Sequence, residues 1–322
     1  MTARGARGAL VLAPLVVVGL SACSGPEPSD EFRDSNLSVR VLQSVQSLNY
    51  PFESDPSYAV RVANLQTRLI NECVEKQGIV PPTVDDIPLD AAAVTPAESR
   101  LWLLPAGDYG VSAALADPAV VASLAAMTGA AETSQPSQPP DPEAYDLAVY
   151  GPPDSRITIE IPGVASVSVP VAGCFGEATK TLYGVDDAAD YERAYHEVPS
   201  IRDVMQELEA DGDVRRATSA WSGCMKDAGH DVKVPTDLYG TMSSWLDGVV
   251  GGVATVADVR AAETALAEDD IACRTSSGFG TTVAKKFLDL ADEKIAGSEG
   301  VIQEFRSMAE HAQSVIAAER AL

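Results

Sequence analysis

The sequence has few aromatic and few basic residues. Aromatic side chains make up 6% of the 322 residues, and 23 Lys and Arg stand against 47 Asp and Glu, for a net charge of −24. Nucleic acids bind proteins through clustered Lys and Arg, so this balance argues against a nucleic-acid partner. Apolar residues reach 46% and include many alanines, which favours a core of closely packed helices over an aromatic-rich β-sandwich.

The apolar run near the N-terminus is too short for a transmembrane helix, which needs about 20 such residues. Residues 10–20 form about half that length and contain Pro14, with Arg4 and Arg7 before them and Leu20-Ser-Ala-Cys23 at their end. A basic start, an apolar stretch and small residues before a cysteine predict a lipoprotein signal peptide at residues 1–22, with the lipid on Cys23. A plain secretory signal is the alternative.

The residues after Cys23 are polar and rich in Pro, Ser and acidic side chains, which predicts a flexible tether at residues 23–36. We expect residues 37–322 to form the helical domain, as one body or as two disulfide-held units at about 37–185 and 186–322. An acidic chain gains nothing from an anionic lipid surface, so the predicted anchor is the covalent lipid. The membrane, reached through this anchor, is the predicted partner.

The five cysteines include no CxxC pair and no Cys/His cluster with zinc spacing, which argues against redox and metal chemistry. Without Cys23, four remain, and in an oxidising compartment they predict two disulfides with three possible connectivities. Cys73 and Cys224 each lie on a predicted helix five residues before a glycine, and a second cysteine follows each. We therefore favour Cys73–Cys174 and Cys224–Cys273. Chance similarity of two helix ends is the alternative.

Periodicity predicts a mainly α fold with one β-hairpin, two disulfides and a long C-terminal helix. The hairpin is expected from alternating strands on either side of Pro162-Gly163, and residues 131–143 are expected to be a linker or loop. Heptad spacing from Leu288 to Ile316 predicts one helix that continues through Gly297 and Gly300. The other predicted helices span residues 36–50, 55–77, 95–104, 111–127, 174–183, 188–196, 200–228, 237–248 and 256–275.

Two cysteine neighbourhoods resemble motifs of uncharacterised actinomycete lipoproteins, W-x-x-C-M-x-x-x-G and A-x-x-D-x-x-C. The matching residues are Trp221, Cys224, Met225 and Gly229, followed by Ala267, Asp270 and Cys273. The hairpin and residues 173–184 are similar to the same group, so the resemblance covers roughly residues 60–320. It departs at Cys73, whose surroundings lack the Trp and Met. The resemblance implies an envelope location, a helical fold and disulfide pairing, and it carries no activity.

Catalytic and metal-binding patterns are missing. No GxSxG or SxxK nucleophile motif occurs, and the three histidines, His196, His230 and His311, are expected on the surface. We therefore predict no catalytic residue, no cofactor and no metal.

Two acidic clusters, Asp186-Asp187 with Asp190 and Asp211-Gly-Asp213, do not fit a calcium-binding EF-hand loop and are expected at solvated helix ends. Asp270 differs from them because it lies three residues before Cys273, on the same side of a predicted helix. We expect Asp270 to make a buried polar contact with the helix that carries Trp221.

The sequence thus predicts a lipid-anchored extracytoplasmic protein with a non-catalytic binding or accessory role at the cell envelope, towards cell wall or a membrane protein. Two alternatives remain open. One is an envelope hydrolase that uses paired carboxylates, which 47 acidic residues could supply. The other is the substrate-binding lipoprotein of an import system, although such proteins have α/β folds and this chain shows a single hairpin.

Overall fold

The computed structural model describes residues 35–48, 57–83, 86–87, 97–103, 109–130, 138–160 and 166–319. The predicted signal peptide, Cys23 and the Pro162-Gly163 turn lie outside these ranges, as does most of the predicted tether, whose last two residues belong to the first helix. The described chain is mainly α-helical with one two-stranded sheet, which confirms the predicted fold class. Its helices are α1 (Ser35–Leu48), α2 (Tyr58–Lys76), α3 (Glu98–Leu103), α4 (Val111–Leu115), α5 (Pro118–Ala130), α6 (Pro142–Tyr150), α7 (Gly173–Tyr183), α8 (Ala188–Glu197), α9 (Ile201–Ala210), α10 (Gly212–Asp227), α11 (Leu238–Val250), α12 (Val256–Ser276), α13 (Phe279–Ala296) and α14 (Glu299–Glu319).

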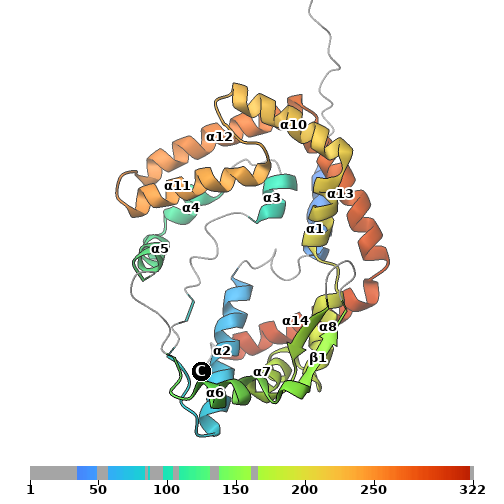
Figure 1. Ribbon diagram of the computed structural model, residues 1–322. Helices are drawn as coiled ribbons and strands as arrows, with labels where there is room; N and C mark the ends of the chain where they lie inside the picture. Colours follow the sequence, from blue (N-terminus) through green and yellow to red (C-terminus); the bar gives the residue numbers. More distant parts are fainter. Residues whose placement is uncertain are drawn as a thin grey trace, which may run out of the picture.

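The helices form two groups, which we call the upper and the lower unit after their places in Figure 1. The upper unit contains α1, α3–α5 and α9–α13, which share the largest hydrophobic cluster. The lower unit contains α2, α6–α8, α14 and the sheet, with two smaller clusters. Each unit takes helices from both sides of residue 185. The core therefore gives no support to a division at about residues 185 and 186, which stays a prediction.

The predicted helix at residues 200–228 is two helices, α9 and α10, and that expectation was wrong. The break falls at Asp211, whose backbone is extended (φ −66°, ψ 136°). Its carboxylate accepts the N–H groups of Asp213 and Val214 at 2.8 and 3.1 Å. An aspartate that caps free N–H groups starts a new helix, so α10 begins directly after α9 ends.

The C-terminal helix α14 is long, as predicted, but the predicted continuity through Gly297 was wrong. α13 ends at Ala296, and Gly297 and Ser298 separate it from α14. The buried apolar side chains of α13 belong to the upper cluster, whereas Phe305, Met308, Ala312 and Ile316 of α14 belong to one of the lower clusters. One straight helix cannot supply both cores, and glycine is a weak helix former, so the chain turns at this point.

The predicted hairpin is confirmed by an antiparallel pair, β1 (Arg156–Ile159) and β2 (Val167–Pro170). Ile157 lies opposite Val169, and Ile159 lies opposite Val167. β1 contacts α8 in the lower unit, which gives the two-stranded sheet the packing partner that an isolated hairpin would lack. The chain then enters α7 at Gly173, whose φ of 64° suits glycine, and the next residue is Cys174.

Candidate functional site

The two disulfides pair the cysteines in the order favoured by the sequence. Cys73–Cys174 joins α2 to α7 in the lower unit, with Cα atoms 5.6 Å apart. Cys224–Cys273 joins α10 to α12 in the upper unit, with Cα atoms 5.5 Å apart. Disulfides persist in oxidising compartments, so both indicate an extracytoplasmic environment.

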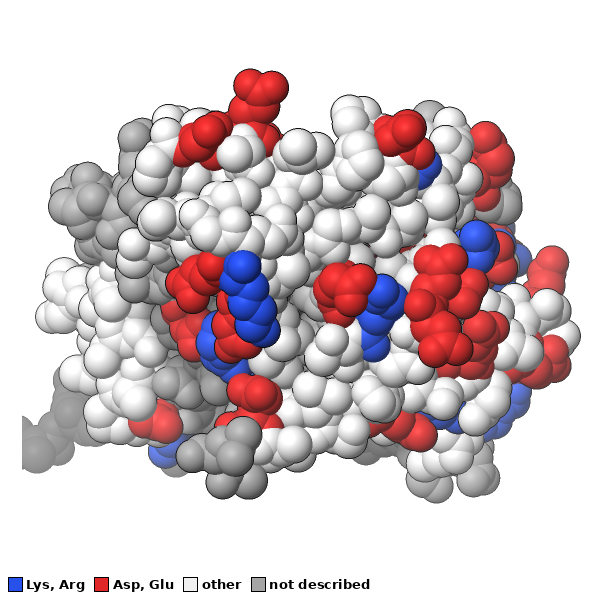
Figure 2. Space-filling view, turned by 90° about the horizontal axis from the view of Figure 1, so that it is seen from below, with Lys and Arg blue, Asp and Glu red and all other residues white. Residues whose placement is uncertain are grey.

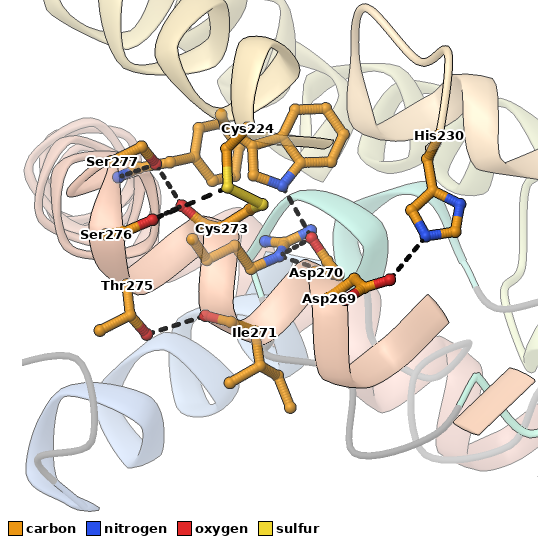
Figure 3. Close-up of a disulfide and its surroundings, with 12 residues drawn as sticks. Cys224, His230, Asp269, Asp270, Ile271, Cys273, Thr275, Ser276 and Ser277 are labelled. Atoms are coloured by element: carbon orange, nitrogen blue, oxygen red, sulfur yellow. Dashed lines mark hydrogen bonds and ion pairs between the residues drawn. A yellow bond between two sulfur atoms is a disulfide. The ribbon is translucent and has the colours of Figure 1, made fainter. Parts of the chain in front are cut away.

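Asp270 lies beside the second disulfide and is completely buried, at the centre of a polar cluster (Figure 3). Trp221 donates its indole N–H to Oδ1 of Asp270 at 2.8 Å, which confirms the expected contact with that helix. Tyr109 donates its hydroxyl to Oδ2 at 3.0 Å, and Arg274 donates Nε–H to both oxygens at 2.8 Å. Asp270 thus connects α12 to α10 and to Tyr109, two residues before α4.

Arg274 extends the cluster to the end of α3. Its Nη1 donates to the carbonyl oxygen of Trp102 at 3.0 Å, and its Nη2 donates to that of Leu101. The guanidinium also packs on the rings of Phe279 and Trp221, at 5.1 and 6.0 Å from their centroids. A cation that binds the last carbonyls of a helix satisfies acceptors left without partners inside the helix.

Glu263 is an anion that binds N–H groups at the start of α4, whereas Arg274 is a cation that binds carbonyls at the end of α3. Its carboxylate is buried and accepts the backbone N–H groups of Tyr109, Val111 and Ser112, each at 2.9 Å. An anion at a helix N-terminus pairs with free N–H groups and with the positive end of the helix dipole. Residues 263, 270 and 274 lie on one face of α12, because spacings of seven and four are close to whole helical turns.

Glu263, Asp270 and Arg274 together hold the end of α3 and the start of α4 against α12. Burial, reinforced by the negative charge of Asp270, raises the pKa of the Tyr109 hydroxyl. Each charged group is hydrogen-bonded within the protein, and at most 2% of any of the three residues is exposed. Removal of one member of such a buried pair would leave the other charge without its partner, so the three groups depend on one another. Their burial leaves no open position from which these groups could act on a ligand.

Arg274 and Glu263 were missed in the sequence, although a pattern for both was present. Arg274 follows Asp270 by four residues, and Glu263 precedes it by seven, so a buried Asp270 places both on the same helix face. Tyr109 gave no comparable indication, because it comes from a segment 161 residues away.

The histidines do not all lie where the sequence predicted. His230 is half-buried, and its Nε2 lies 2.9 Å from Oδ2 of Asp269. His196 is also half-buried, with Nε2 3.9 Å from Glu192, whose pKa is raised by burial. The expectation of surface positions was therefore wrong for these two: Asp269 of α12 lies beside His230, and Glu192, one turn earlier on α8, lies beside His196. His311 is exposed, as expected.

The two acidic clusters lie at helix ends, as predicted. Asp187 accepts the N–H of Ala189 at 2.9 Å at the start of α8. Asp211 caps α10 and lies 3.0 Å from Lys286. The hydrogen bond from Lys286, together with the backbone N–H groups, lowers the pKa of Asp211. Among the described residues, no group of three or more His, Cys, Asp or Glu side chains could hold a metal ion.

Comparisons of the chain with protein-family models, curated proteins and solved structures found no match. Within the described ranges, every helix is too short or too polar to cross a membrane. The resemblance to actinomycete lipoproteins therefore stays a prediction that depends on the cysteine motifs.

Proposed function

We propose that this chain is a lipid-anchored extracytoplasmic protein with a non-catalytic binding or accessory role at the cell envelope. The observation that carries the proposal is the use of the cysteines. Cys73, Cys174, Cys224 and Cys273 are all joined in disulfides, so Cys23 is the one of the five cysteines that these two disulfides do not use. It follows an apolar run and two small residues, the arrangement typical of a lipid attachment site.

The roles of the buried charges support the non-catalytic part of the proposal. An enzyme with two carboxylates needs both to reach its substrate. Asp270 and Glu263 are the most deeply buried carboxylates in the described chain, and their oxygens accept hydrogen bonds from Trp221, Tyr109 and backbone N–H groups. These contacts serve packing, so Asp270 and Glu263 are not the carboxylate pair that an envelope hydrolase would use.

The anchor is tested by expressing the full chain and its Cys23→Ser variant in a bacterium that modifies lipoproteins. We expect the wild-type protein in the membrane fraction, with a mature N-terminus at Cys23 and a mass increased by acyl chains. The variant, expressed with a cleavable secretory signal in place of residues 1–22, should carry no lipid and should leave the membrane fraction. A wild-type protein without lipid, or a lipidated C23S variant, would contradict the anchor.

The binding role is tested by crosslinking the lipidated protein in its native membrane and identifying what it captures. Cell-wall fragments or a specific membrane protein, recovered with the wild-type chain and not with the released C23S variant, would support the proposal. Recovery of neither in repeated experiments would contradict it.

A further inference from the structure

The turn between α11 and α12 is an uncharged, apolar projection on an acidic protein. Residues 248–257 read GVVGGVATVA and contain no charged side chain. Figure 1 places this turn at the edge of the upper unit, at the end of the α11–α12 hairpin. By contrast, acidic and basic side chains are spread over the face shown in Figure 2, which looks onto the molecule from below. The turn thus differs from the charged patches visible on that face.

Val253 at this turn is 86% exposed, more than any other large apolar side chain in the described part of the chain. The turn closes α11 in the Schellman arrangement, in which Val253 N–H donates to the carbonyl of Gly248 at 2.9 Å and Gly252 N–H to that of Val249 at 3.0 Å. In Schellman arrangements the residue at the position of Val253 usually packs against the side chain of the residue five positions earlier, which here is Gly248. Glycine offers no such side chain, so Val253 stays uncovered.

The backbone of the turn already has its hydrogen bonds. Gly251 and Ala254 donate their N–H groups to the carbonyls of Asp247 and Gly248, and Thr255 donates its own to the carboxylate of Asp258. With the two bonds of the Schellman arrangement, every N–H from residue 251 to 255 is paired within the turn. Unpaired backbone groups are the main cost of moving a loop into lipid, and here that cost is reduced.

The neighbouring helix α5 enlarges the same uncharged surface. Its 13 residues, PAVVASLAAMTGA, include no charged side chain, and it packs against α11 and α4. Pro118, Ala119 and Ala122 are exposed on it. Exposed aspartates flank this surface at residues 117, 247 and 258, so the turn and α5 can approach a bilayer only as far as its interfacial region, where these carboxylates stay in water.

We infer that the turn at residues 248–257 inserts Val253 into the interfacial region of the lipid bilayer to which the protein is anchored. The inference rests on the proposed lipid on Cys23. The 11 residues between Cys23 and Ser35 span at most about 40 Å when extended, so the domain stays beside the membrane. The occupant of the apolar turn is then the bilayer itself, and the turn orients the anchored domain.

The test uses Trp substitutions in the full lipidated chain, reconstituted in phosphatidylcholine vesicles with brominated acyl chains, which quench nearby Trp fluorescence. Val253→Trp is compared with Val80→Trp, because Val80 is also an exposed valine (64%) but follows α2 in the lower unit. We expect the brominated vesicles to quench V253W strongly and to leave V80W at the level of the wild type. Equal quenching of the two variants would overturn the inference.

A second arm separates this inference from the anchor. The C23S variant without residues 1–22 lacks both the lipid and the apolar run of the signal, so its binding to phosphatidylcholine vesicles reports the surface of the folded chain. Adding Val253→Asp should lower the partition coefficient about tenfold, while adding Val80→Asp should change it less than twofold. A wild-type protein without lipid would contradict the anchor but would not change the comparison of partition coefficients between the V253D and V80D variants. A dimer in solution that V253D dissociates would assign the turn to a second copy of the chain and overturn the inference.

Discussion

The upper and lower units contain the same disulfide arrangement in different surroundings. Each disulfide joins two helices at nearly the same Cα distance, 5.5 and 5.6 Å. In the upper unit the disulfide lies beside a buried polar network, which is formed by Asp270, Arg274 and Glu263 of α12. In the lower unit the first disulfide packs with Val74 and Val149, and its nearest polar contact is the Gln77 amide, which donates to Sγ of Cys174 at 3.2 Å. The comparison shows the same covalent link beside a buried charged network in one unit and in a mainly apolar cluster in the other.

The largest expected effect is the loss of either disulfide. The chain-entropy model gives about 4.7 kcal/mol for Cys73–Cys174, with a separation of 101 residues, and about 4.1 kcal/mol for Cys224–Cys273, with a separation of 49. We expect the pairwise Cys→Ala variants to lower the free energy of unfolding by about these amounts in urea titrations.

Hydrogen exchange of the same two variants sharpens the comparison. The C224A/C273A variant keeps the hydrogen bond between Trp221 and Asp270, which joins the same two helices, so α10 and α12 should stay protected. The C73A/C174A variant has no comparable polar link between α2 and α7, and their amides should exchange faster. Equal loss of protection in the two units would refute the distinction.

Removal of the Asp270 carboxylate should cost nearly as much. The Asp270→Ala variant leaves the Arg274 guanidinium buried without its anion, and breaking a buried pair in this way costs about 3–5 kcal/mol. The control is Asp292→Ala, which removes the exposed pair with Arg40 and should cost less than about 1 kcal/mol. Urea unfolding of the two variants measures both. Similar values would mean that the buried network does not stabilise the upper unit.

The hydroxyl of Tyr109 should make stability depend on alkaline pH. Burial raises its pKa in the folded chain, so the protonated form is favoured in the fold. Its contribution is complete below the pKa of an exposed tyrosine, about 10, and is lost as the pH rises through the folded value. We expect Tyr109→Phe to lower the free energy of unfolding by about 1 kcal/mol at pH 8 and to reduce its decline above pH 10.

Trp221→Phe is the matched control, because it also removes one hydrogen-bond donor to Asp270 but no titrating group. Its free energy of unfolding should be lower at every pH, with the alkaline decline of the wild type. A Y109F variant that declines as steeply as W221F would show that Tyr109 does not cause the alkaline loss.

The smallest effect is expected in the aromatic stack of the lower unit. Tyr191 stacks on Tyr183 with ring centroids 3.7 Å apart, and such a pair is worth about 0.5–1.5 kcal/mol beyond its buried area. Tyr191→Leu should therefore lower the thermal midpoint by a few degrees, and Tyr195→Leu, at a residue 48% exposed, should change it less. A larger shift for Y195L would place the stabilising contact at Tyr195.

The sequence predicted those elements whose ends it encodes locally. The bounds of α7 were correct within one residue, because Gly184 takes a left-handed conformation (φ 67°) directly after it. The start of α12 was correct because Thr255 and Asp258 form a capping box. α6 was not predicted, since the proline-rich residues before it resembled a linker. The residues that could have predicted α6 are Asp141 and Pro142. Asp141 caps the helix by accepting the N–H of Ala144, and Pro142 occupies the first helical position.

The candidate site was predicted only in part, because its partners come from distant segments. Asp270 and Trp221 share cysteine motifs, so their contact could be expected. The carbonyls of Leu101 and Trp102, which Arg274 binds, lie more than 170 residues away. A single sequence carries no information on which backbone carbonyl a buried arginine will meet. Periodicity gives the buried face of a helix, and the packing of the whole chain decides its partners.

The central claim is that one cysteine attaches the lipid and four hold the fold. Mass spectrometry of the mature protein purified from membranes, as an intact chain and as a non-reduced peptide map, tests both parts. We predict an acylated N-terminal Cys23, the linked peptides Cys73–Cys174 and Cys224–Cys273, and no free thiol. An unmodified Cys23, or any of the other four cysteines free or differently paired, would contradict the account.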